Sequence, residues 1–114
     1  MILTIERKQI APDITVLALN GRIILGNNSR DVELKLAEVL KDQARKIIFD
    51  LSGVTMLDST GVGILVVSQG KIKQEGGEMR IAGATGIVGE ILQMTSVDKL
   101  VHVYPTAAAA ATNF

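Results

Sequence analysis

The stretch TMLDSTGVGILVV, residues 55–67, places three polar residues between a strand pattern and a helix pattern. The run before it, KIIFDL at residues 46–51, is almost wholly apolar, which is typical of a central strand covered on both faces. The run after it predicts a helix over residues 59–75 that ends at Gly76-Gly77, because glycine readily adopts the left-handed conformation of a helix end. A buried strand followed by a helix is the repeating unit of α/β proteins.

The remaining elements are predicted on both sides of this unit. Runs of β-branched residues indicate strands, and apolar residues at helical spacing indicate helices. The predicted strands are residues 2–9, 14–20, 78–82 and 101–104, and the predicted helices are residues 29–41 and 86–95. A hairpin followed by strands joined through helices implies a mixed sheet, antiparallel at its start and parallel afterwards. We therefore expect a single α/β domain over residues 1–114, with a mixed central β-sheet and packed α-helices.

Side-chain patterns give two further expectations. The inward faces of the first and last of the three helices are expected to carry Val32, Leu36, Ala37 and Leu40, and Ile87, Val88, Ile91 and Leu92, respectively. Residues 106–114 form either a short terminal helix or a disordered tail, since five alanines favour a helix but offer few apolar atoms to a core. For the same reason we expect the domain to stay folded when residues 107–114 are deleted.

Composition restricts the function. The 114 residues carry 12 basic and 12 acidic side chains, so no overall positive field attracts nucleic acid. The absence of cysteine excludes disulfides, thiolate catalysis and cysteine zinc sites. No apolar run reaches the roughly 18 residues of a membrane span, and the N-terminus lacks a signal-peptide pattern. We expect a soluble, cytoplasmic protein that neither inserts into a membrane nor binds nucleic acid directly.

The polar stretch does not match a serine hydrolase. The nucleophile turn of α/β-hydrolases has a glycine two residues before the serine, and Leu57 stands at that position before Ser59. The one histidine, His102, lies between two valines in a predicted strand, where a structural role is expected rather than that of a general base.

The spacing of the glycines and acidic residues does not match a phosphate-binding loop or a metal site. Gly61 and Gly63 form a G-x-G, but Val66 stands where a dinucleotide-binding loop has its third glycine. Asp50 and Asp58 have no second pair of acids and no histidine to complete a metal site. The sequence therefore predicts no catalytic residue, no metal site and no cofactor.

Two interpretations of the polar stretch remain open. Asp58 or Ser59 can cap the following helix by accepting a hydrogen bond from a backbone N–H, which needs only one side chain. Three polar residues in a row exceed that need, and Gly61 and Gly63 each cost a helix interior about 1 kcal/mol relative to alanine. Bare backbone at this point indicates that something approaches it closely, either the sheet beneath or a partner above.

A longer segment carries a family resemblance. FDLSGVTMLDSTGVGILVVSQGKIKQEGGEMRIAG, residues 49–83, resembles the signature half of the STAS domain, in particular of bacterial anti-sigma-factor antagonists. In that family the first serine of the motif is phosphorylated by an anti-sigma factor that is also an ATP-binding protein kinase. The resemblance implies this role for Ser59. It gives Asp58 a part in loop conformation and kinase recognition, and it makes Thr60 the second hydroxyl and Gly61 the motif glycine.

The same resemblance implies partner switching. The unmodified domain binds the anti-sigma factor and frees the sigma factor, whereas the phosphorylated domain does not bind. A phosphatase that removes the Ser59 phosphate is a further implied partner. The residues expected to meet the anti-sigma factor are Asp58, Ser59, Thr60, Gly61 and Val62, together with Gly21, Arg22 and Asn27 from an expected loop at residues 21–28. The alternative is a STAS subunit that is not phosphorylated and docks to a transporter or another multiprotein complex.

Overall fold

Strands and helices alternate around a five-stranded sheet in the computed structural model, which describes residues 2–114. The elements follow one another as β1 (Thr4–Ala11), β2 (Ile14–Ile23), α1 (Arg30–Lys41), β3 (Lys46–Leu57), α2 (Ser59–Gln74), β4 (Glu78–Ala82), α3 (Gly86–Met94), the 3-10 turn η1 (Val97–Lys99), β5 (His102–Tyr104) and α4 (Ala107–Ala111). The strand order is β1-β2-β3-β4-β5, with β1 antiparallel to β2 and the other neighbouring pairs parallel. The predicted α/β fold and mixed sheet are therefore confirmed.

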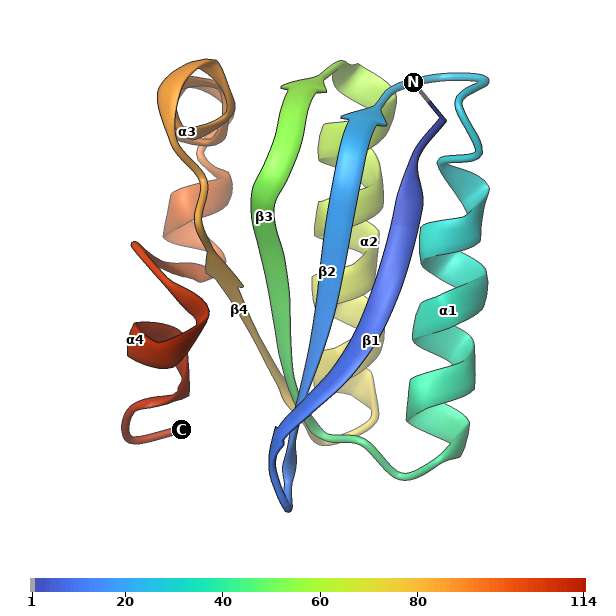
Figure 1. The fold of residues 1–114 in the computed structure, drawn as a ribbon, viewed down its shortest axis with the longest axis vertical. Helices are drawn as coiled ribbons and strands as arrows, with labels where there is room; N and C mark the ends of the chain where they lie inside the picture. Colours follow the sequence, from blue (N-terminus) through green and yellow to red (C-terminus); the bar gives the residue numbers. More distant parts are fainter. Residues whose placement is uncertain (1) are drawn as a thin grey trace.

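The two faces of the sheet carry separate apolar cores. Figure 1 shows α1 and α2 behind the sheet and α4 in front of it. The larger core lies between the sheet and α1, α2 and α3 and contains Ile47 and Phe49 of β3. The smaller core lies against α4 and contains Ile48 of the same strand. Because all three side chains are fully buried, β3 is the central strand, covered on both faces, that the run KIIFDL predicts.

The inward faces of two helices differ in part from the prediction. In α1 the buried stripe is Val32, Leu36 and Val39, whereas Ala37 is exposed and Leu40 half-buried. Spacings of four and three residues follow the helical repeat, and Ala37 lies beside this stripe rather than on it. In α3, Val88 and Leu92 are buried and Ile91 is half-buried, but Ile87 is 47% exposed. The covered part of these helices is narrower than expected.

Strands β2 and β3 are longer than the sequence predicts. β2 continues to Ile23 and β3 to Leu57, so residues 52–57 are strand rather than loop. The two extensions pair with each other in parallel, beginning with Asn20 opposite Gly53 and with small shifts of register on the way. A side chain at Gly53 would displace the Asn20 amide and press against the Leu19 carbonyl, so the glycine leaves room for the Asn20 side chain beside β3. The extension brings the end of β2 beside the start of α2.

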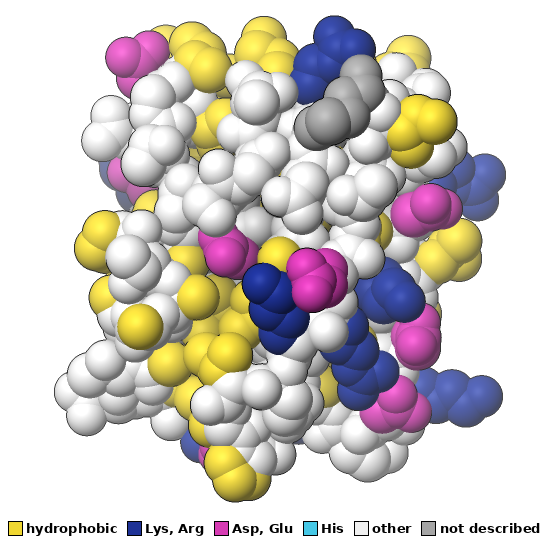
Figure 2. All heavy atoms as spheres, viewed as in Figure 1, with side chains coloured by type: hydrophobic (Ala, Val, Ile, Leu, Met, Phe, Trp, Pro, Cys, Tyr) yellow, Lys and Arg dark blue, Asp and Glu magenta, His cyan; other side chains and the backbone are white. Residues whose placement is uncertain are grey.

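The tail is a short helix that packs on the sheet. Ala110 of α4 is fully buried against apolar side chains of the smaller core. These side chains are Ile14, Val16, Ile48 and Ala82. Figure 2 shows apolar side chains gathered on the α4 side of this face, with charged side chains over the strands beside them. Of the two predicted states of the tail, the helix is the one observed.

One arginine fastens the tail to β4. Arg80 is only 8% exposed, and its guanidinium donates hydrogen bonds to the carbonyl oxygens of Ala110 at 2.8 Å, Thr112 at 3.0 Å and Asn113 at 3.1 Å. The guanidinium also lies 4.0 Å from the centre of the Phe114 ring. The expectation from the sequence counted only the methyl groups of the alanines, whereas these contacts also tie the tail to β4, so we expect deletion of residues 107–114 to lower the stability of the domain.

Candidate functional site

Asp58 alone separates β3 from α2 and caps the helix. Its backbone is extended, and its Oδ1 accepts a hydrogen bond from the Gly61 N–H at 2.9 Å. This is the side-chain cap of a helix N-terminus. The sequence allowed either Asp58 or Ser59 as the capping residue, and the structure shows that it is Asp58. Ser59 is the first residue of α2 and takes no part in the capping.

The second carboxylate oxygen of Asp58 binds a loop that is distant in the sequence. Leu25, in the segment between β2 and α1, donates its N–H to Asp58 Oδ2 at 2.9 Å across a separation of 33 residues. The Asp58 N–H in turn donates to the Ile23 carbonyl at 3.4 Å. One aspartate therefore joins the end of β2, the following loop and the start of α2.

Leu25 is a candidate contact residue that the sequence analysis missed. Its side chain is 77% exposed although it is large and apolar. The sequence around it offers no signal, because its link to Asp58 exists only once β2 and β3 pair along their full length. The backbone hydrogen bond fixes the position of Leu25, so its apolar side chain is presented to solvent beside the start of α2.

The hydrogen bonds hold the pKa of Asp58 below its ordinary value. The Leu25 N–H is the largest cause, partial desolvation opposes it, and the Gly61 N–H is a further cause. A carboxylate with a lowered pKa stabilises the folded state at any pH above the pKa that it has in the unfolded chain. This stabilisation is lost as the pH falls through the lowered pKa of the folded state.

Replacing Asp58 is therefore expected to have a pH-dependent effect on stability. Asp58→Ala should lower the free energy of unfolding by about 1 kcal/mol at neutral pH, because the cap and the Leu25 bond are lost. The difference from the natural chain should shrink as the pH falls below about 4, where the carboxyl of the unfolded chain takes up a proton first, and it should vanish below the lowered pKa of the folded chain. Urea unfolding at pH 7 and pH 3 measures both values.

Glu90 supplies a matched control, since it is an exposed acid without an ion pair or hydrogen bond in the described part of the chain. Glu90→Ala should leave the free energy of unfolding unchanged at both pH values. An equal loss for Asp58→Ala at pH 7 and pH 3 would contradict the assigned role of the carboxylate.

The two hydroxyl residues of the motif differ in environment. Ser59 is exposed, and its hydroxyl makes no hydrogen bond within residues 2–114. Thr60 is half-buried and lines a cavity of about 460 Å³ whose walls include Leu25, Gly26 and Ile64. Ser59 is thus the hydroxyl that an enzyme can reach from outside, while Thr60 faces the groove beside the Leu25 loop.

The two glycines of the motif have different neighbours. A side chain at Gly61 would collide with the Ile23 carbonyl of β2, so this glycine allows the helix to approach the sheet. A side chain at Gly63 would meet open space, and Val62 between them is half-buried. The sequence left open whether the sheet or a partner approaches these glycines. At Gly61 it is the sheet, whereas next to Gly63 the space is open to a partner.

The remaining predicted contact residues do not form one loop. Gly21 and Arg22 belong to β2, which corrects the expected loop at residues 21–28. Gly21 is buried with a φ of +115°, a conformation that favours glycine, and a side chain there would press against the backbone of Ile2 and Leu3. Arg22 is exposed, and Asn27 donates its side-chain N–H to the Arg22 carbonyl at 2.8 Å. Asn27 therefore shapes the loop that carries Leu25.

Residues 2–114 contain neither a membrane-spanning helix nor a cluster of metal ligands. None of the helices in this range combines the length and the apolar character needed to span a bilayer. Over the same range, no three histidine or acidic side chains stand close enough together to hold a metal ion.

Comparisons with known proteins identify one family. The family model of the STAS domain matches residues 7–110. The anti-sigma-B factor antagonist of Staphylococcus aureus is 30% identical over 73 residues, which are 64% of this chain and 68% of that protein.

Solved structures share the fold. The crystal structure of an anti-sigma factor antagonist from Mycobacterium paratuberculosis superposes with a TM-score of 0.85 at 24% identity, covering 96% of this chain and 92% of that one. The phosphorylated form of the Bacillus cell fate determinant SpoIIAA gives a TM-score of 0.71 at 15% identity, covering 94% of this chain and 96% of that one.

Proposed function

Because this chain belongs to the STAS domain family, we propose that it is an anti-sigma factor antagonist whose binding is switched off by phosphorylation of Ser59. In this role it is a binding protein and not an enzyme. Its partner is an anti-sigma factor with an ATP-binding kinase domain, and binding releases the sigma factor. A phosphatase restores the active form, and both reactions take place in the cytoplasm.

The observation that carries the proposal is the environment of the Ser59 hydroxyl. The hydroxyl is exposed, has no hydrogen bond within residues 2–114 and stands in the first turn of α2. Capping belongs to Asp58, so modification of Ser59 removes no stabilising contact. Backbone N–H groups at a helix N-terminus also tolerate an added anion. Phosphorylation is therefore compatible with the native fold.

The surroundings of Ser59 are suited to a protein interface. Leu25 presents an apolar side chain, the groove lined by Thr60 lies beside it, and Gly63 leaves helix backbone bare on the outer side. A partner that packs on this surface removes water from Ser59. A phosphate of charge about −1.5 to −2, next to the ionised Asp58, would then be buried without a counter-charge.

Replacing Ser59 with alanine tests the proposal. Ser59→Ala should fold with the same stability within about 0.5 kcal/mol, because Asp58 retains the cap. It should co-purify with a kinase-type anti-sigma factor, and that factor with ATP should phosphorylate the natural chain but not the variant. Mass spectrometry of both chains after incubation locates the phosphate.

Two outcomes would contradict the assignment. A phosphate on Thr60 that releases the partner from Ser59→Ala would move the switch to the neighbouring hydroxyl. Recovery of transporter subunits, with no phosphate on either chain, would instead support the alternative of a docking subunit that is never phosphorylated.

A further inference from the structure

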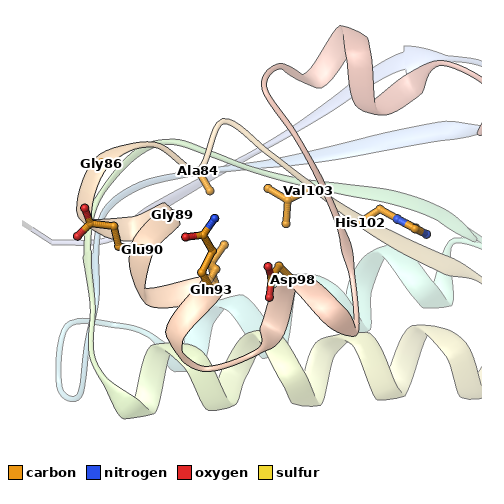
Figure 3. A pocket seen from close by; sticks show the side chains of 9 residues that line it. Ala84, Gly86, Gly89, Glu90, Gln93, Asp98, His102 and Val103 are labelled. Carbon is orange, nitrogen blue, oxygen red and sulfur yellow. The ribbon is translucent and has the colours of Figure 1, made fainter.

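A second surface lies away from the motif, between α3, η1 and the edge strand β5. It encloses a cavity of about 610 Å³, and none of the residues from Asp58 to Gly63 lines it. Figure 3 shows Gln93 of α3, Asp98 of η1 and Val103 of β5 pointing toward one another, with Ala84 above them. In the same view His102 points away and Glu90 lies farther along α3.

The charges of this cavity are of one sign. Asp98 and Glu90 are its charged lining residues, and both carry a carboxylate. Neither forms an ion pair within residues 2–114, although the chain as a whole has equal numbers of acidic and basic residues. The local excess of negative charge therefore favours a cationic group. Because no three metal-ligating side chains gather in the described residues, this group is organic rather than a metal ion.

The wall of the cavity formed by β5 is a sheet edge. β5 pairs with β4 on one side and has no neighbouring strand on the other within residues 2–114. The backbone carbonyl of Tyr104 accepts a hydrogen bond from the Gly83 N–H at 3.0 Å, so the peptide groups of Tyr104 point toward β4. Since successive residues of a strand alternate in direction, Val103 directs its N–H and C=O away from β4. The Val103 side chain is 38% exposed on the cavity side.

We propose that this groove binds an extended segment of a partner protein that pairs with the backbone of Val103 and places an arginine or lysine side chain against Asp98. The Gln93 amide oxygen is a second acceptor for that cation, and Glu90 attracts a further basic residue along the segment. Main-chain hydrogen bonds to a sheet edge are a general mode of peptide recognition, with side-chain pockets giving the specificity. This surface acts independently of Ser59.

A short peptide that alternates valine and arginine is the probe. The isotope-labelled full chain is titrated with it by amide chemical-shift mapping, and shifts are expected at Gly89, Asp98 and Val103. The same peptide with glutamate for arginine should bind at least about tenfold more weakly. Asp98→Asn should weaken binding of the arginine peptide about fivefold or more, because a charge-assisted contact is lost.

Two further variants make the result decisive. Asp31→Asn, at an exposed acid of α1 that has no ion pair in the described residues, should leave the affinity unchanged. Val103→Pro removes an N–H that does not pair with β4 and should abolish binding while the amide spectrum stays native. Equal binding of both peptides, shifts confined to other surfaces, or equal effects of Asp98→Asn and Asp31→Asn would overturn the proposal.

Discussion

Phosphorylation of Ser59 is expected to weaken binding of the kinase-type anti-sigma factor by at least about a hundredfold, which corresponds to about 3 kcal/mol. The serine stands at the point where the Leu25 loop, Asp58 and α2 meet, so a partner that covers the loop also covers the phosphate. A buried and unpaired dianion next to a carboxylate costs several kcal/mol, and such a penalty acts mainly on the bound state.

The free domain should change only locally. The modified side chain is exposed at a helix N-terminus, where backbone N–H groups stabilise an anion. Amide chemical-shift mapping of the natural and phosphorylated chains should therefore show changes near Ser59 and Leu25 and none along β4. Calorimetric titration of the partner into both forms measures the affinity difference.

Asp58→Asn separates charge repulsion from steric exclusion. The substitution removes one negative charge at nearly the same shape, but the amide has one acceptor oxygen and keeps only one of the two bonds to Leu25 and Gly61. The unphosphorylated Asp58→Asn variant is therefore the reference, and against it phosphorylation should reduce the affinity by less than in the natural chain. Unchanged affinity after complete phosphorylation would remove Ser59 from the mechanism. Shift changes that spread through β3 and β4 would indicate a refolding switch instead of a local block.

The order of the elements could be predicted from the sequence because it depends on local patterns. The run KIIFDL has too few polar residues for a half-exposed strand, and the helix over residues 59–75 is bounded by polar residues and two glycines. Strand ends could not be predicted in the same way. Residues 52–57 contain glycine and two hydroxyl residues, and they are strand only because β2 supplies a partner along this length.

Only the part of the site that is contiguous in the sequence could be predicted. The motif Asp58-Ser59-Thr60 is contiguous, so a resemblance reveals it directly. The contact of Asp58 with Leu25 depends on the pairing of two strands that are distant in the sequence, so it could not be predicted from the spacing of residues. The buried position of Gly21 depends likewise on the start of the chain packing over β2. Local sequence identified the candidate modification site, whereas tertiary structure adds the surface around it.

The tail gives the largest expected effect on stability. Deleting residues 107–114 exposes Ile14, Val16 and Ile48 to water and removes the contacts of the Arg80 guanidinium. At about 25 cal/mol per Å² of apolar surface, uncovering this part of the sheet should cost about 3 kcal/mol. For a domain of this size the midpoint of thermal unfolding should then fall by at least about 10 °C.

Two point variants test whether the tail stabilises the domain by packing on the sheet. Ala110→Asp places a charge at a fully buried position and should reproduce most of the loss caused by the deletion, because the helix cannot dock. Ala108→Ser, at an exposed position of the same helix, should change the midpoint by no more than about 2 °C. Thermal unfolding followed by circular dichroism measures the natural chain, the deletion and the two variants under one condition.

If the deletion lowers the midpoint by less than about 4 °C, the contacts of Arg80 and Ala110 contribute little and the smaller core is stable without its helix. If Ala110→Asp is as stable as Ala108→Ser, the helix does not pack where α4 lies.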